Sequence, residues 1–295
     1  MAVTTLTATR SRIGAYVALT KPRIIELLLV TTVPVMFVAE QGVPPLWLVV
    51  ATVLGGSLAA GGANAINMVV DRDIDALMER TRNRPLVTGE LTPRAALVFA
   101  LSLEVAAFAL LWSTVNLISA VLAVSACLFY VFVYTLWLKR TSKQNIVIGG
   151  AAGAVPTLIG WTAVTGSLAW APVVLFGVIF FWTPPHFWAL AIRYREDYSA
   201  ASVPMLPSVA DDDTVGTQIV LYTLVVWALT LVFVPVGDMG WLYTVAAVVL
   251  GAVFTYQSLR LKGDPTPERA MALFHWSITY ISLLFGVMAV DPLLT

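Results

Sequence analysis

The sequence has little of what most catalytic or metal sites are built from. It contains a single cysteine, Cys127, and only two histidines, His186 and His275. One cysteine excludes an intrachain disulfide and a cluster of metal-binding thiolates. Charged residues make up 12% of the 295 residues, and the 17 basic residues balance the 17 acidic ones. Since no excess of positive charge is present, no nucleic-acid partner is expected.

What the sequence has in abundance is apolar residues. They account for 59% of the chain, with a mean hydropathy of +0.86, whereas soluble domains are about half apolar and a quarter charged. A helix needs ~20 apolar residues to cross a bilayer. The chain is therefore predicted to be an all-α, polytopic membrane protein with nine transmembrane helices in a single bundle. The predicted spans are 18–40, 46–68, 95–113, 116–138, 146–165, 170–192, 216–236, 240–261 and 270–291.

Residues 1–17 are predicted to form a short cytoplasmic tail, and 18–295 a single domain. The tail lacks a small-residue cleavage site after a short apolar core, so no secretory signal is predicted.

The basic residues fix the orientation of this arrangement. All 17 fall on the same side of the nine predicted spans, and the opposite loops have none. Basic loops remain in the cytoplasm. The N-terminus is therefore predicted to be cytoplasmic and the C-terminus outside, in a plasma (cytoplasmic) membrane, with the site described below on the cytoplasmic side.

The densest charged segment, NMVVDRDIDALMERTRNRPL, begins at Asn67 directly after an apolar run. Asn67, Asp71 and Asp75 are four residues apart, which on a helix places them on one face. Asp73 points away, toward solvent or an arginine. An amide oxygen and two carboxylates are hard ligands that suit Mg²⁺, which usually takes one or two carboxylates together with substrate phosphates.

Cations accompany these acids. Arg80, Arg82 and Arg84 follow immediately, and Lys139 lies in the next cytoplasmic loop. One guanidinium group can donate two hydrogen bonds to two phosphate oxygens at once. Carboxylates for a metal beside arginines for phosphate therefore predict a diphosphate that is bridged to the protein through Mg²⁺. Three other arginines are interpreted as ordinary solvated loop charges, namely Arg72, Arg94 and Arg140.

The pattern NxxxDxxxD followed by RTRNRPL resembles the UbiA-type intramembrane prenyltransferase superfamily, and the resemblance extends over essentially the whole chain. It implies transfer of an isoprenoid from its diphosphate to an aromatic acceptor, with Mg²⁺ holding the diphosphate. The residues predicted to take part in catalysis are Asp71, Asp75, Arg80, Arg84 and Lys139, together with His186, which is considered below.

A second charged loop, IRYREDYSAASVPMLPSVADDD, follows the sixth predicted span. Superfamily members carry a second set of acids here, four residues apart. This chain instead has Tyr194 and Tyr198 around Asp197, so a second Mg²⁺ site is in doubt. Asp197 is the remaining candidate metal ligand beside Asn67, Asp71 and Asp75, and Asp197 and Tyr198 are expected to close the pocket.

Three blocks, NMVVDRDIDALMERTRNRPLVTG, YTLWLKRTSKQNIVIGGAAGAVPTLIGW and TPPHFWALAIRYREDYSAASVPMLP, closely resemble one branch of the superfamily, the haem O-forming farnesyltransferases. The resemblance implies that farnesyl diphosphate is joined to a vinyl group of haem B with addition of water, giving haem O and diphosphate. Haem B would then be a substrate, and a downstream haem-modifying enzyme is a further candidate partner.

His186 follows Pro184-Pro185 inside an apolar span, where the prolines predict an irregular helix. An ionisable residue in a membrane is a functional hypothesis by default, and imidazole can ligate haem iron. A histidine bonded to a neighbouring helix is the alternative. His275 is interpreted in that second way.

Further side chains are predicted to contact the substrate or to face the bundle. Tyr130 and Tyr134, one turn apart, could shield an allylic cation. Glu104 is expected to face the bundle, because facing lipid would be costly. The remaining candidate substrate-binding residues are Arg23, Asn64, Arg82, Lys143 and Arg193.

Two other functions are compatible with parts of the sequence. A prenyltransferase of the same superfamily acting on a quinone precursor fits the first charged segment equally well, but not the third block. A transporter or lipid-binding protein could use the acids as an ion site, although such residues usually lie near the bilayer midplane.

Overall fold

The computed structural model describes residues 11–294, and within that range every regular element is a helix. The all-α prediction is confirmed for these residues. In chain order the helices are α1 (Arg12–Thr20), α2 (Pro22–Glu40), α3 (Leu46–Val70), α4 (Arg72–Leu77), α5 (Pro93–Thr114), α6 (Leu117–Leu128), the π-helix η1 (Phe129–Leu138), α7 (Lys139–Thr141), α8 (Asn145–Thr165), α9 (Trp170–Arg193), α10 (Arg195–Ala200), α11 (Leu206–Val209), α12 (Asp212–Val236), α13 (Trp241–Gly263), α14 (Pro267–Val290) and the 3₁₀ turn η2 (Asp291–Leu293).

Eight helical segments among the described residues are long and apolar enough to cross a membrane. They correspond to the second to ninth predicted spans, with α6, η1 and α7 together forming one of them. The first predicted span falls on α2, of which Leu29–Glu40 is an apolar helical stretch among the described residues. Eight candidate spans are therefore shown, and the ninth crossing remains a prediction.

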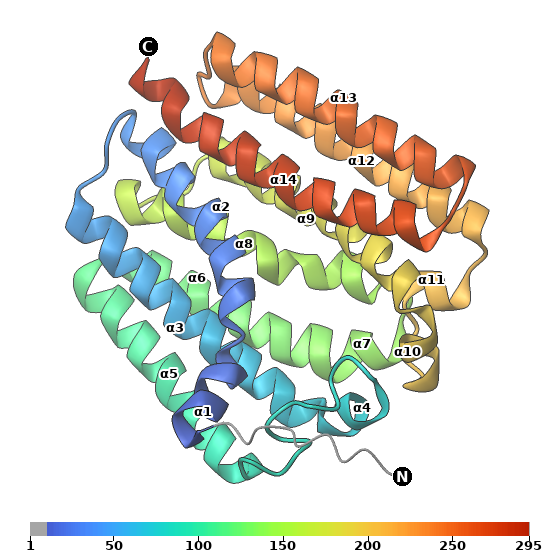
Figure 1. Cartoon of the computed structure of the whole chain (residues 1–295). Coiled ribbons are helices and arrows are strands. Elements are labelled where there is room, and N and C mark those ends of the chain that lie inside the picture. The colour runs from blue at the N-terminus through green and yellow to red at the C-terminus, as the bar shows by residue number, and fades with distance from the viewer. Residues whose placement is uncertain (1–10, 295) are drawn as a thin grey trace.

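The long helices run side by side in one bundle (Figure 1). Helices α3 and α5 lie on one side, α12 and α13 on the other, and α2, α8, α9 and α14 between them. Long helices that follow one another along the chain pack as neighbours, as in α8–α9 and α12–α13. This is the arrangement expected when short loops join antiparallel helices.

The short elements gather at one end of the bundle, which we call the charged end. It comprises α1, α4, α7, α10, α11 and the loop 78–92 (Figure 1). The other end carries the loops 41–45, 115–116, 166–169 and 237–240, together with η2. No basic residue occurs in those four loops or in η2, so the basic residues lie at the charged end, as the sequence predicts.

Tight packing between the central helices holds the bundle together. The largest buried cluster joins α2, α8, α9, α12, α13 and α14 through aliphatic and aromatic side chains. Close backbone approach is needed where α8 crosses α2: a Cβ atom on Gly160 would lie 2.4 Å from the carbonyl oxygen of Thr32. A larger residue at position 160 would force the two helices apart.

One local expectation differs from the structure, and two further features add to the sequence predictions. The predicted tail 1–17 overlaps α1, because residues from Arg12 onward form a helix whose Ala15 and Leu19 are buried against α3 and α5; residues 1–10 lie outside the described residues. The predicted irregularity at Pro184-Pro185 is wrong, since α9 continues through both prolines. Missing backbone donors are tolerated there because neighbouring helices cover this part of α9. The fourth span also contains a π-helix that the sequence did not signal.

Candidate functional site

The three aligned polar residues lie where α3 ends at the charged end of the bundle. Asn67 is on the last turn of α3, Asp71 is the residue at which α3 stops, and Asp75 is in α4, which continues after a slight break. Their exposed fractions are 3%, 0% and 2%. The amide Nδ2 of Asn67 donates to Asp71 Oδ2 at 2.7 Å. The predicted common face is thus present, and it is buried rather than solvated.

Cations from two other segments converge on these carboxylates. Lys139, at the end of the fourth span, forms an ion pair with Asp71 Oδ2. Arg84, from the loop after α4, lies 2.6 Å from Asp75 Oδ2. Both basic side chains are mostly buried. The structure therefore brings together four of the predicted residues, Asp71, Asp75, Arg84 and Lys139, from segments up to 68 residues apart.

Arg140 belongs to this cluster, contrary to its interpretation as a solvated loop charge. Its two terminal nitrogens donate to the carboxylate of Asp73 at 2.7 Å each, and one also donates to the Val70 carbonyl at 3.1 Å. The same guanidinium lies 3.8 Å from Asp71 Oδ1. The hydrogen bonds from Arg140 lower the pKa of Asp73 to about 2. Asp73 is exposed and is paired with an arginine.

One carboxylate oxygen in the cluster has an unused lone pair. Asp71 Oδ1 is completely buried and has no hydrogen-bond donor. A buried polar atom without a partner is costly, and such an atom beside the Asn67 amide and the Asp75 carboxylate is suited to a hard cation. Asn67, Asp71 and Asp75 therefore fit Mg²⁺ chemically.

Asp197 does not complete a set of four ligands. Its two carboxylate oxygens accept hydrogen bonds from the backbone N–H groups of Glu79 and Arg80, at 3.4 and 3.3 Å. Among residues 11–294 no three His, Cys, Asp or Glu side chains converge as a metal site would require. The predicted ligand group is thus not assembled with Asp197. Its observed contacts instead fasten the second charged loop onto the first.

Two tyrosines of the second loop contact the same region. The guanidinium of Arg80 lies 5.8 Å from the centre of the Tyr194 ring. Tyr198 is buried against Ile74 and Met78 of the first segment. Burial raises the pKa of the Tyr198 phenol, and the neighbouring Arg80 opposes that rise. These contacts hold the second loop against the first charged segment.

The π-helix η1 supplies another wall. Tyr130 and Tyr134 stack with ring centres 5.4 Å apart, and Thr135 accepts a hydrogen bond from Asn67 Nδ2 at 3.1 Å. Thr135 also donates to the Tyr130 carbonyl five residues earlier, at 2.8 Å. Gly149 of α8 makes room for this wall, because a Cβ there would fall 2.3 Å from the Tyr134 ring. π-helices often occur at functional sites.

The junction between α1 and α2 lies on the last turns of α3, at the charged end of the bundle. Lys21 donates from Nζ to Asn67 Oδ1 at 3.0 Å, and Asn64 Nδ2 donates to the Thr20 carbonyl at 3.0 Å. The sequence interpretation selected Arg23 in this segment, but Arg23 is exposed and Lys21 is the residue that reaches the cluster. Lys21 and Thr135 were not predicted, because each contacts Asn67 from a segment 46 or 68 residues away.

Three predicted basic residues lie outside the cluster. Arg82, Lys143 and Arg193 are exposed at the charged end, and Arg82 pairs with Glu79 at 3.5 Å. Arg80 is exposed as well, above the second loop. These four side chains are exposed, whereas Arg84 and Lys139 touch the acids.

His186 packs between α9 and α14. Its ring stacks between Trp182 and Phe274, with centres 4.3 and 4.6 Å away, and Nδ1 lies 2.7 Å from Ser277 Oγ. These are the contacts of a histidine bonded to a neighbouring helix. The Ser277 bond leaves Nε2 as the nitrogen able to reach an iron, so axial ligation remains a prediction. Glu104 faces α3, as expected: a Cβ on Gly62 would lie 2.6 Å from its Oε1.

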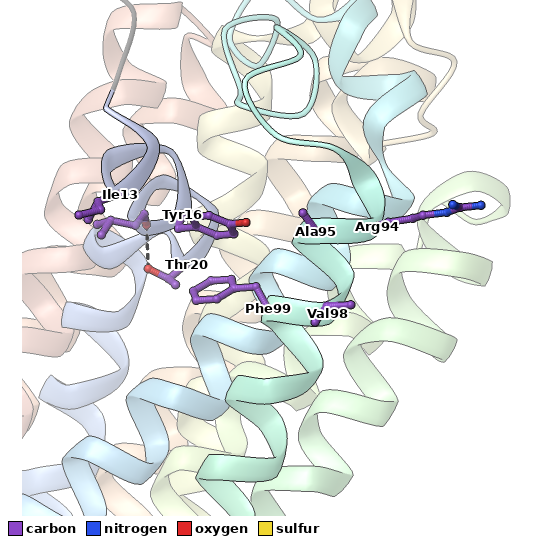
Figure 2. Close-up of a pocket in the computed structure, with 8 residues that line it drawn as sticks. Ile13, Tyr16, Thr20, Arg94, Ala95, Val98 and Phe99 are labelled. Carbon is purple, nitrogen blue, oxygen red and sulfur yellow. Dashed lines mark hydrogen bonds between the residues drawn. The ribbon is translucent and has the colours of Figure 1, made fainter.

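An apolar groove lies between α1 and α5 (Figure 2). It has a volume of about 680 Å³. Tyr16 and Phe99 approach each other across it, with ring centres 4.9 Å apart, while Arg94 points away from α1 (Figure 2). A smaller recess of about 220 Å³ lies between Asp73 and Arg140 on one side and the second loop on the other.

Comparison with known proteins agrees with this arrangement. The model of the UbiA prenyltransferase family matches residues 28–278. The protoheme IX farnesyltransferase of Streptomyces avermitilis is 55% identical over 290 residues, which cover 96% of this chain and 95% of that protein. The digeranylgeranylglyceryl phosphate synthase structure superposes with a TM-score of 0.80 at 16% identity, covering 96% of this chain and 99% of that one. A UbiA homologue from Archaeoglobus fulgidus bound to GPP and Mg²⁺ has a TM-score of 0.64 at 17% identity, covering 94% and 100%.

Proposed function

The chain belongs to the UbiA prenyltransferase family and, within it, to the protoheme IX farnesyltransferases, and from this premise we propose the reaction and the residues that carry it out. It is a membrane-embedded prenyltransferase. In the proposed reaction, a farnesyl group passes from farnesyl diphosphate to a vinyl group of haem B, and water is added, which gives haem O and diphosphate. The choice of farnesyl and haem B rests on the similarity to these relatives.

The observation that carries the proposal is the buried cluster at the charged end. Two buried carboxylates and an amide follow one another at helical spacing there, Asp71 has an oxygen with no donor, and Lys139 and Arg84 lie against the acids. A solvated loop would gain nothing from burying these groups, since buried charges are costly. A diphosphate complexed to a divalent cation would satisfy both signs of charge at once.

Asn67, Asp71 and Asp75 would hold Mg²⁺ in this site. When bound, the ion supplies Lewis-acid stabilisation of the diphosphate oxygens. A UbiA homologue from Archaeoglobus fulgidus bound to GPP and Mg²⁺ supports the choice of this ion. Asp197, which is tied to the Glu79 and Arg80 backbone, is proposed as a closing residue and not as a ligand in the present conformation.

The first step breaks the bond between the farnesyl carbon and the diphosphate oxygen, and the leaving diphosphate takes the electron pair. Arg84 and Lys139 neutralise the charge that develops on it, with Arg80 approaching from the loop after α4, where it lies against Tyr194 of the second loop. Such preorganised cations stabilise the transition state more than the ground state, because the charge grows as the bond breaks. The present ion pairs with Asp71 and Asp75 hold Lys139 and Arg84 in position for this role.

The second step forms a carbon–carbon bond. The π electrons of the haem vinyl group attack the farnesyl cation, and the new cation beside the porphyrin captures water and loses a proton. The stacked rings of Tyr130 and Tyr134 can stabilise the first cation through their faces. The apolar helices around the site exclude water until the carbon–carbon bond has formed.

The membrane arrangement is part of the proposal. One nine-helix domain would cross the plasma membrane with its charged end on the cytoplasmic side and its C-terminus outside. The accumulation of basic residues at one end of the bundle supports this orientation. Farnesyl diphosphate would then reach the cluster from the cytoplasm while its tail enters the apolar bundle.

Reconstituted activity tests the proposal directly. Purified protein in lipid, given haem B, farnesyl diphosphate and Mg²⁺, is expected to yield haem heavier by a farnesyl group plus water, detected by mass spectrometry of extracted haem. The product should disappear when EDTA removes the metal. Transfer of farnesyl to an added phenolic acid, with haem unchanged, would retain the superfamily but reject haem B in favour of a quinone precursor. Absence of both products would reject prenyl transfer.

A further inference from the structure

The junction between α1 and α2 carries a cation that the proposed chemistry does not yet use. Lys21 ends α1 in a left-handed conformation, with φ of 52°, and Pro22 begins α2. A non-glycine residue rarely adopts this backbone conformation. Here the turn directs the Lys21 side chain at the end of α3, where Nζ donates to Asn67 Oδ1.

The partner of this ammonium is a neutral amide. In the part of the chain that the structure describes, Asp71 is paired with Lys139 and Arg140, Asp75 is paired with Arg84, and no carboxylate lies within ion-pair distance of Lys21. A buried cation is stable only when an anion or several hydrogen bonds compensate its lost hydration. Lysine has three donors, so Lys21 has capacity for an anion that enters the cluster.

The position of Lys21 is fixed by the helices around it. Asn64, one turn before Asn67, holds the Thr20 carbonyl at 3.0 Å. A Cβ on Gly61 would lie 3.2 Å from Thr20, so the junction sits directly on α3. Thr20 also bonds back to the Val17 carbonyl at 2.8 Å, the dashed line in Figure 2. Lys21 is thus held at the site by packing on both sides.

We propose that Lys21 binds the diphosphate of the prenyl donor, and that on binding its ammonium moves from Asn67 Oδ1 to a diphosphate oxygen. The amide oxygen of Asn67 then becomes available to the metal. The inference rests on the proposed function and adds a substrate-binding residue to it. It also accounts for the hydrogen bond between Lys21 and Asn67. Lys21 Nζ would exchange this bond for a diphosphate oxygen, and Asn67 Oδ1 would exchange it for the metal.

Binding of inorganic pyrophosphate to the purified full chain tests this without turnover. Titration calorimetry with Mg²⁺ present compares the wild type with Lys21→Gln and Lys21→Arg. Glutamine keeps a donor for Asn67 but removes the charge, so affinity for pyrophosphate is expected to fall at least about 10-fold. Arginine keeps the charge and should retain most of the affinity. Arg12→Met, which removes an exposed charge from the same helix, is the matched control and should bind like the wild type.

The outcomes separate this inference from the proposed function. Wild-type affinity in Lys21→Gln, together with loss of binding in Asp71→Asn, would overturn the role of Lys21 and leave the diphosphate site standing. Equal loss in Lys21→Gln and Lys21→Arg would show that the residue acts by packing alone and would also overturn it. If the wild type itself does not bind pyrophosphate with Mg²⁺, the proposed function fails with the inference.

Discussion

At the scale of single residues, the site depends on charges buried in compensating pairs. Asp71 and Asp75 are almost inaccessible, and each is matched by a cation: Asp71 by Lys139 from the fourth span, and Asp75 by Arg84 from the loop after α4. Removing one member of a buried pair leaves the other charge without a partner. This usually destabilises the protein by more than the intact pair stabilises it. Substitutions here should therefore be isosteric, so that effects on chemistry can be separated from effects on folding.

Replacing Asp71 or Asp75 by asparagine is expected to lower prenyl transfer by at least about 100-fold, because a charged oxygen facing the metal and diphosphate is lost. The side-chain volume is unchanged, so the protein should still insert and elute as a single species. Product formation measured by mass spectrometry, at saturating Mg²⁺, gives the comparison.

The matched control is Asp73→Asn, an exposed carboxylate in the same segment that pairs with Arg140. Its activity should stay within about threefold of the wild type, since exposed pairs contribute little. Near-normal turnover in either Asp71→Asn or Asp75→Asn would refute the assigned roles.

At the scale of elements, the π-helix η1 is the feature that shapes the pocket. Its wider turn brings Tyr130, Tyr134 and Thr135 onto the side that faces α3 and α8. A regular helix would rotate these side chains relative to one another, because it has fewer residues per turn. The apolar sequence of this span gave no sign of the change, since its residues would suit either helix.

Gly149→Ala tests whether this wall matters. The added methyl group would lie 2.3 Å from the Tyr134 ring, so the ring must move, and overpacking of this kind typically costs about 1–3 kcal/mol. We expect at least a fivefold loss of prenyl transfer and a lower thermal unfolding temperature, measured by loss of soluble protein in detergent.

Gly153→Ala is the control on the same helix, where a Cβ would meet nothing within 4 Å. Alanine favours a helix over glycine by about 1 kcal/mol, so this variant should be as stable as the wild type or more so, with unchanged activity. Equal behaviour of the two alanine variants would show that the Tyr134 contact is unimportant.

At the scale of the whole molecule, the distribution of charge determines how the bundle sits in the membrane. Loops at the charged end carry the basic residues and the proposed site, while the loops at the other end carry none. The orientation therefore also decides from which side the water-soluble diphosphate is received.

Cysteine labelling in intact cells is expected to show this orientation. In a Cys127→Ser background, Ser167→Cys, in an exposed loop at the uncharged end, should react with a membrane-impermeant maleimide. Ser199→Cys, exposed in α10 at the charged end, should react only after the membrane is permeabilised. The reverse pattern would place the charged end outside and contradict the predicted topology.

By itself, the sequence determined the helical class, eight of its spanning segments, the side on which charge collects, and the alignment of Asn67, Asp71 and Asp75. These follow from apolar length and helical periodicity, which are local properties of the chain. Only the tertiary structure decided that Lys21, Thr135 and Arg140 join the cluster, that Asp197 binds the backbone of the first loop, and that His186 contacts Ser277. Each of these contacts joins segments 46 to 118 residues apart, and helix packing brings such residues together in a way that local periodicity does not encode.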